Sequence, residues 1–145
     1  MPGLAANPAG TVALRKALDS AREHIETKGT AFMQALVLEA FRRVSARTPV
    51  DTGRARGNWH LTSGAPSEEV DHNRFDPSGA IGLAEAEAEI PAVGIIEPSY
   101  VVNNIEYIGA LEHGHSKQVP PGGIVALTVA ELGPIADGLV RQLGD

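Results

Sequence analysis

The chain has 145 residues, 43% of them hydrophobic, which is the size of one ordinary domain with enough apolar material for a core. It contains no cysteine, which excludes disulfide bonds, thiol catalysis and cysteine-based zinc sites. Its net charge of −6 argues against a dedicated nucleic-acid binder, and no apolar run reaches the roughly 18 residues of a membrane span. The first residues also lack the basic and apolar regions of a signal peptide. We therefore expect residues 1–145 to form a single soluble domain with no membrane partner.

The charges are unevenly distributed along the chain. Residues 1–56 carry nine Lys and Arg against five Asp and Glu, a balance of +4. Residues 57–145 carry three against thirteen, a balance of −10. This asymmetry favours electrostatic steering or charge-matched docking between copies, although two solvated surfaces would give the same counts.

Apolar residues recur with helical spacing over residues 11–47. They follow one another at intervals of three, four or seven: Leu14, Leu18, Ala21, Ile25, Phe32, Leu36, Ala40 and Val44. Thr11 can cap the start of this helix, and Thr48-Pro49 ends it, because the residue before a proline is displaced from the helical region. Gly29 leaves open a division into two helices. The segment before the helix, residues 1–10, is predicted to be a flexible N-terminus.

The predicted helix is too long for the domain to which it belongs. At 1.5 Å per residue it would span about 55 Å, whereas a compact domain of this size has a diameter of roughly 38 Å. The helix would therefore extend beyond its own domain, and its apolar stripe would need a partner.

Shorter elements follow the long helix. A strand is predicted at residues 58–62, where Trp59 and Leu61 alternate with polar neighbours. Residues 64–79 are too polar and proline-rich for a core element and are predicted to form an exposed loop or arm. The remaining predicted elements are a helix at 78–90, strands at 93–96 and 99–103, a short helix at 105–112, and a last helix at 123–143 with a possible kink at Gly133-Pro134. This order predicts an α+β fold, with the long N-terminal helix packed on a small, mostly antiparallel sheet, a short middle helix and a C-terminal helix.

One short motif contains possible metal ligands. Glu112, His113 and His115 supply a carboxylate and two imidazoles, which are zinc-type ligands. The glycines and prolines around them indicate a loop, and no further ligand stands at a recognisable spacing. We therefore expect His113 and His115 to make structural hydrogen bonds. The alternative is a metal-dependent hydrolase that uses them, with Glu112, as metal ligands. No cofactor and no catalytic residue is predicted, since the chain has no Gly-x-Ser-x-Gly elbow and no phosphate loop with lysine.

Charged side chains form two further groups. Five arginines gather within fifteen positions: Arg42, Arg43, Arg47, Arg54 and Arg56. Only Trp59 lies near them, so the aromatic residues of a nucleic-acid site are missing. The helix dipole, or salt bridges to the acidic half of the same or a neighbouring copy, would account for these arginines. The acidic run with Glu85, Glu87 and Glu89 is interpreted as a solvated helix face, and a small DNA-mimicking or regulatory binding module stays an alternative.

Two motifs in a fixed order resemble those of a known family. Residues 48–56 have the sequence Thr-Pro-Val-Asp-Thr-Gly-Arg-Ala-Arg and are followed by Asn58-Trp59. Further along, Tyr107 precedes a Leu-Glu-x-Gly sequence at residues 111–114, and a proline-containing loop and the C-terminal helix come next. This order is similar to that of the tail-completion proteins of long-tailed bacteriophages, over about residues 12–143.

The resemblance implies a small α+β subunit of the virion without catalytic activity. Such a subunit would form a homo-oligomeric ring in the neck, expected to be six-fold, at the head-proximal end of the tail. Its partners would be the tail tube or tail terminator protein and the head connector proteins, and it would meet passing DNA only passively. Assembly would take place in the host cytoplasm. A head-completion protein or another minor tail protein is the alternative within the same class.

The candidate structural or interface residues lie in these motifs: Asp51, Thr52, Gly53, Arg54, Tyr107, Glu112 and Gly114. Asp51 and Thr52 can bond backbone amides in a tight turn, in which Gly53 supplies a positive φ. Arg54 would then be placed to pair with the Glu112 carboxylate. The acidic side chains after residue 56 could line a passage for DNA, since like charge discourages binding.

Overall fold

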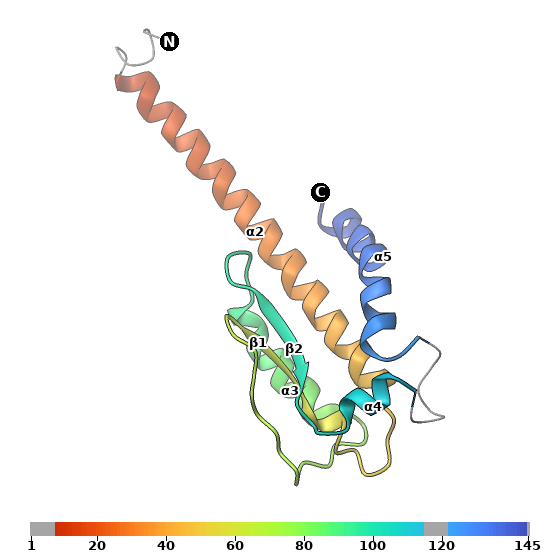
Figure 1. Ribbon diagram of the computed structural model, residues 1–145. Helices are drawn as coiled ribbons and strands as arrows, with labels where there is room; N and C mark the ends of the chain where they lie inside the picture. The colour runs from red at the N-terminus through yellow and green to blue at the C-terminus, as the bar shows by residue number, and fades with distance from the viewer. Residues whose placement is uncertain (1–7, 115–121, 145) are drawn as a thin grey trace.

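The computed structural model describes residues 8–114 and 122–144, which form an α+β fold as predicted (Figure 1). In chain order the elements are α2 (Pro8–Arg47), the 3-10 helix η1 (Arg56–Asn58), β1 (Trp59–Ser63), α3 (Ala80–Glu89), the 3-10 helix η2 (Ile90–Ala92), β2 (Ser99–Asn103), α4 (Ile108–Glu112) and α5 (Val125–Leu143). Figure 1 shows the strand pair and α3 on one side of the C-terminal half of α2, and α5 on the other. None of the described helices is both long and apolar enough to cross a membrane.

The long helix α2 is continuous. It begins at Pro8, so the predicted flexible N-terminus is helical from that residue on, and the rest of that segment lies outside the described residues. The helix passes Gly29 without a break and ends before the predicted Thr48-Pro49 stop. Gly29 serves close packing, because a Cβ added there would lie 2.8 Å from Ile95 Cγ2. As its length predicted, the 40-residue helix extends well beyond the rest of the molecule (Figure 1).

The hydrophobic core lies where the C-terminal half of α2, the strand pair, α3 and the start of α5 meet. Its buried apolar side chains are Val37, Phe41, Val44, Trp59, Leu61, Ala86, Val93 and Ile124. Trp59 and Leu61 belong to it, as their alternation in the sequence predicted. His60 between them is also buried, with 8% of its surface exposed, and its Nδ1 faces Glu69 at 3.8 Å. The strand β1 is thus more deeply buried than a simple alternation of apolar and polar residues implies.

Thr48 links the end of α2 to the core. Its buried hydroxyl donates to the Val44 carbonyl at 2.7 Å and accepts the Trp59 indole N–H at 2.7 Å. We expect Thr48→Val, which keeps the shape and removes both bonds, to lower the free energy of unfolding by about 1.5 kcal/mol, because the buried indole N–H loses its acceptor. Urea unfolding followed by tryptophan fluorescence measures the change. The control is Thr62→Val, since the Thr62 hydroxyl bonds an exposed carbonyl; an equal loss in the two variants would contradict the role of Thr48.

The sheet consists of two antiparallel strands, β1 and β2. Their register pairs Trp59 with Asn103, His60 with Val102, Leu61 with Val101, Thr62 with Tyr100 and Ser63 with Ser99. The strand predicted at residues 99–103 is confirmed, whereas the one predicted at 93–96 is wrong. The Gln34 side-chain amide of α2 donates to the carbonyls of Ile90 and Val93, both at 3.1 Å. A side chain therefore occupies backbone acceptors in the segment that leads into the predicted strand, and this segment packs on α2 instead of pairing.

The shorter helices begin later than predicted. α3 starts two residues after the predicted Ser78 position, because the buried Asp76 carboxylate accepts the N–H groups of Ile81 and Gly82 at 3.2 and 2.9 Å and caps the helix. α4 starts at Ile108 instead of residue 105, and α5 starts at Val125 instead of residue 123. α5 continues through Pro134 as one helix.

The loop at residues 64–79 is mostly exposed, as predicted, but it is fastened to the strand pair. The Asn58 side chain donates to the Asp71 carbonyl at 3.0 Å and accepts the Asp71 N–H at 2.8 Å. The Asn104 amide donates to the Ser67 carbonyl at 2.8 Å. These side-chain bonds hold the loop against the fold at both strands, so it is not a free arm.

Candidate functional site

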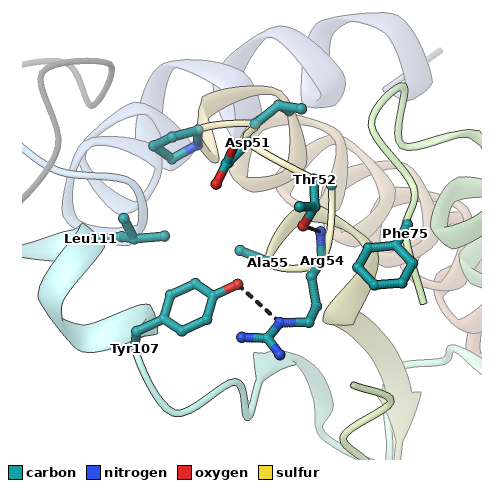
Figure 2. Close-up of a pocket in the computed structure, with 10 residues that line it drawn as sticks. Asp51, Thr52, Arg54, Ala55, Phe75, Tyr107 and Leu111 are labelled. Carbon is teal, nitrogen blue, oxygen red and sulfur yellow. Dashed lines mark hydrogen bonds between the residues drawn. The ribbon is translucent and has the colours of Figure 1, made fainter. Parts of the chain in front are cut away.

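A surface cleft forms where the turn after α2 meets the segment that leads into α4 (Figure 2). Its volume is about 510 Å³. Ten residues line it: Pro49, Val50, Asp51, Thr52, Gly53, Arg54, Ala55, Phe75, Tyr107 and Leu111. Figure 2 shows Tyr107 and Leu111 across the cleft from Asp51 and Arg54. Five of the seven candidates from the sequence motifs are among the lining residues, so the fold brings the two motifs together.

The turn after α2 is built largely as its sequence predicted. The Thr52 hydroxyl accepts the Arg54 N–H at 3.3 Å. Gly53 has a φ of 88°, and its carbonyl accepts the Asp76 N–H at 3.1 Å. The predicted roles of Thr52 and Gly53 are therefore confirmed. Asp51 accepts no hydrogen bond from the described residues, contrary to prediction, and its exposed carboxylate points toward the cleft (Figure 2).

Arg54 reaches from the turn to the segment before α4. Its Nε donates to the Tyr107 hydroxyl at 3.3 Å, and its Nη2 donates to Glu106 Oε1 at 3.3 Å. The guanidinium carbon lies 5.2 Å from the centroid of the Tyr107 ring, within the range of a cation–π contact. The hydrogen bond to Tyr107 raises the pKa of Arg54 above its ordinary value, so the cleft keeps a positive charge at physiological pH. These contacts fix a cation at the wall of the cleft.

Arg54 does not pair with Glu112, so that prediction is wrong. The Glu112 carboxylate instead accepts the N–H groups of residues 124–126, at distances of 2.6 to 3.1 Å. It thereby caps the start of α5, where the positive end of the helix dipole favours a carboxylate. Gly123 permits this approach, because a Cβ added there would lie 2.6 Å from Glu112 Oε2. Glu112 therefore connects α4 to α5 and does not line the cleft.

The hydrogen bonds at α5 keep the Glu112 carboxylate ionised. Partial burial, the largest single influence, raises its pKa. The three backbone amides and the nearby His113 together outweigh burial, and the pKa lies below its ordinary value of 4.5. The stability that Glu112 contributes should therefore depend on pH in the acidic range.

The possible metal ligands around Glu112 are not gathered in the described part of the chain. His113 is exposed after α4, and His115 lies outside the described residues. Within residues 8–114 and 122–144, no three His, Cys, Asp or Glu side chains are grouped so that they could hold a metal ion. Gly114, with a φ of 90°, continues the chain in the left-handed conformation that often follows a helix. Gly114 thus has a role in the backbone and lies outside the cleft lining.

The clustered arginines are engaged within one copy of the chain. Their ion pairs are Arg42 with Glu87, Arg43 with Glu131, Arg47 with Glu131 and Arg54 with Glu106. Arg56 donates to the backbone carbonyls of Pro77 and Thr48. The interpretation as salt bridges between the basic and acidic halves is confirmed within a single copy. Because these guanidinium groups already have partners, the cluster does not present a free phosphate-binding surface.

A second groove, of about 640 Å³, lies beside β1 and α3. Its lining includes His60 and the carboxylates of Glu69, Glu85 and Glu89. Arg74 binds Glu85, and burial, the main influence, lowers the pKa of His60 and favours its neutral form. The groove contains neither of the two sequence motifs, so the cleft at the 49–55 turn is the better candidate.

Two charged or aromatic residues of the site escaped the sequence analysis. Phe75 lines the cleft from the 64–79 loop, and Glu106 binds Arg54. Phe75 could have been noticed in the sequence, because it is one of only three phenylalanines in the chain and stands in a polar loop. Nothing in the sequence distinguished Glu106 from the other acidic residues as the partner of Arg54.

The chain was compared with protein-family models, curated proteins and solved structures, and none of the three comparisons gave a significant match.

Proposed function

We propose that the protein is a structural subunit of the neck of a tailed bacteriophage, which completes the tail and joins it to the head connector as a member of an oligomeric ring. One observation carries the proposal. The two motifs that resemble those of tail-completion proteins line the same cleft and contact each other through Arg54 and Tyr107, although 53 positions separate these residues. The α+β fold agrees with the subunit that the resemblance implies.

The chemistry of the cleft suits a segment of a protein partner. Arg54 and Asp51 place a cation and an anion beside the exposed ring of Phe75 and the apolar side chain of Leu111. A partner segment could donate to the Asp51 carboxylate, accept from the Arg54 N–H groups that Tyr107 and Glu106 do not use, and cover Phe75 with an apolar side chain. Arginine and aromatic residues are common anchors of protein interfaces. We therefore assign the cleft to contact with a neighbouring neck or tail component.

Particles made without the protein test this proposal. Deletion of its gene from the phage is expected to give free heads beside unjoined tails in electron micrographs. Intact virions formed without the protein would overturn the proposal. A coding position beside the portal, head and tail genes is the expected genomic observation.

Arg54→Ala tests the role of the cleft itself. We expect this variant to fold normally, because its ion pair is solvent-exposed, and to lower the yield of joined particles about tenfold when it replaces the natural protein. Circular dichroism checks the fold, and plaque counts with electron microscopy check the joining. The matched control is Arg42→Ala, which removes an exposed ion pair with Glu87 outside the cleft. Equal yields for the two variants would show that the cleft is not the interface.

A further inference from the structure

The N-terminal part of α2 exposes large apolar side chains. We call residues 12–27, which project beyond the rest of the molecule in Figure 1, the extension. Its Leu14, Leu18 and Ile25 are 49%, 61% and 66% exposed. With Ala21 they follow intervals of four, three and four, which places all four on one side of the helix. We call this set the apolar stripe, and it has no cover from the described residues of its own chain.

The apolar stripe continues the side of α2 on which α5 packs. Lys28, three residues after Ile25, donates through Nζ to the carbonyl of Leu143, the last residue of α5, at 2.8 Å. At the other end of the contact, Arg43 of α2 donates to Glu131 of α5 at 2.9 Å. With 19 residues α5 spans about 28 Å, whereas the 40 residues of α2 span about 60 Å. The stripe is therefore uncovered because α5 ends where the extension begins.

A second side of α5, about 100° around the helix from Thr128, which bonds Arg47 of α2, is also apolar and is largely left uncovered by the described residues. Val129 and Val140 are 58% and 56% exposed, and Gly133 and Ala136 lie between them at the same intervals of four, three and four. A Cβ added at Gly133 would have no atom of the described residues within 4 Å, so these residues leave the space above it open. We call these four residues the outer face of α5. A helix that is apolar on two sides is normally covered on both.

We propose that the extension of one copy packs antiparallel along the outer face of α5 of a second copy. In this alignment Leu18 lies opposite Ala136, and the bulky stripe residues fit over the small residues of the outer face. Ala21 lies opposite Gly133, where two small residues let the helices approach closely. Because the apolar stripe and the outer face of α5 share intervals of four, three and four residues, each stripe residue meets one residue of the outer face.

Charge favours α5 over a second extension as the occupant. Arg15 follows Leu14 beside the stripe, and the antiparallel alignment places it next to Asp137, which is exposed beside the outer face. Two extensions paired antiparallel with each other would instead set Arg15 beside Arg22 of the second copy, a like charge that Glu26, 3.3 Å from Arg22, only partly offsets. The stripe therefore matches the outer face in shape and in charge.

This contact would propagate from copy to copy. Each copy has one extension and one outer face, and the two belong to different surfaces, so every copy can bind two neighbours head to tail. Such a contact closes into a ring when the rotation between copies permits. The inference that a ring results rests on the proposed function, whereas the contact between extension and α5 stands on the surfaces of this chain.

Cysteine cross-linking tests the contact directly, because the natural chain has no cysteine. Ala21→Cys combined with Gly133→Cys is expected to give covalent dimers and higher oligomers under mild oxidation. The bond must join two copies, since Gly133 lies near Glu131 and hence near Arg43 of its own α2, about 30 Å along that helix from Ala21. Glu23→Cys with Gly133→Cys is the matched control and should stay monomeric on gels, because Glu23 lies on the opposite side of the helix. Dimers from Ala21→Cys alone would show that two extensions pair and would overturn the proposal.

Association in solution gives a second readout. Leu18→Asp is expected to weaken self-association in analytical ultracentrifugation about a hundredfold, because it places a charge in the apolar contact. Val12→Asp is the control, since Val12 is 56% exposed but lies about 200° around the helix from Leu14, off the stripe. Equal effects of the two substitutions, or a natural protein that is monomeric at about 1 mM, would overturn the contact. Oligomers that cross-link as expected while phage particles form without the protein would overturn the neck function and leave the contact standing.

Discussion

Gly53→Ala is expected to lower the free energy of unfolding by about 3 kcal/mol. Gly53 has a φ of 88°, which side chains other than glycine rarely adopt. A Cβ there would also lie 2.8 Å from the backbone N and C atoms of Asp76 and closer still to the nitrogen of Pro77. Backbone atoms cannot move aside as a flexible side chain can, so strain and overlap add. Urea unfolding followed by circular dichroism measures the loss.

Gly114→Ala separates the two contributions. Gly114 has nearly the same φ, 90°, but a Cβ there would meet no atom of the described residues within 4 Å. We expect this variant to lose only about 1 kcal/mol, the cost of the left-handed conformation alone. Similar losses at Gly53 and Gly114 would show that the packing of the turn against Asp76 is not important.

Glu112→Gln is expected to lower the free energy of unfolding by about 2 kcal/mol at pH 7. The carboxylate accepts the N–H groups of residues 124–126 with both oxygens, and burial of Ile124 makes the loss of its hydrogen bond costly. An amide keeps one acceptor oxygen and loses the charge that the helix dipole stabilises. The unfolding temperature of both proteins measured by circular dichroism checks the difference.

The effect of Glu112→Gln should disappear in acid. The pKa of Glu112 is lowered in the folded state from its ordinary value of 4.5. Its stabilising contribution is therefore complete above pH 4.5 and declines as the pH falls through the lower folded value. The two proteins should differ most at neutral pH and converge in acid. The control is Glu97→Gln, an exposed carboxylate in the connection before β2, which should change stability little. A difference for Glu112→Gln that does not vary with pH would contradict the capping role.

Most local elements of this protein could be predicted from short stretches of its sequence. The spacing of apolar residues and Thr48-Pro49 predicted the long helix and its end, because both signals act within one or two helical turns. Because the predicted helix is longer than the diameter of a compact domain of this size, the sequence also predicted that the helix extends beyond the fold. The Asp-Thr-Gly-Arg turn was also readable, since Gly53 needs a positive φ and Thr52 bonds a nearby amide.

Which distant residues meet depends on how the elements pack together. Arg54 had several acidic residues as possible partners, and the strand register and the segment before α4 selected Glu106 and Tyr107. The same packing sent Glu112 to the start of α5 and set Val93 and Ile95 against α2 instead of in a strand. Periodicity and turn chemistry report contacts between near neighbours in the chain, whereas an ion pair or a cap depends on the relative placement of whole elements. That placement follows from burial of the core, which no short stretch of the sequence encodes alone.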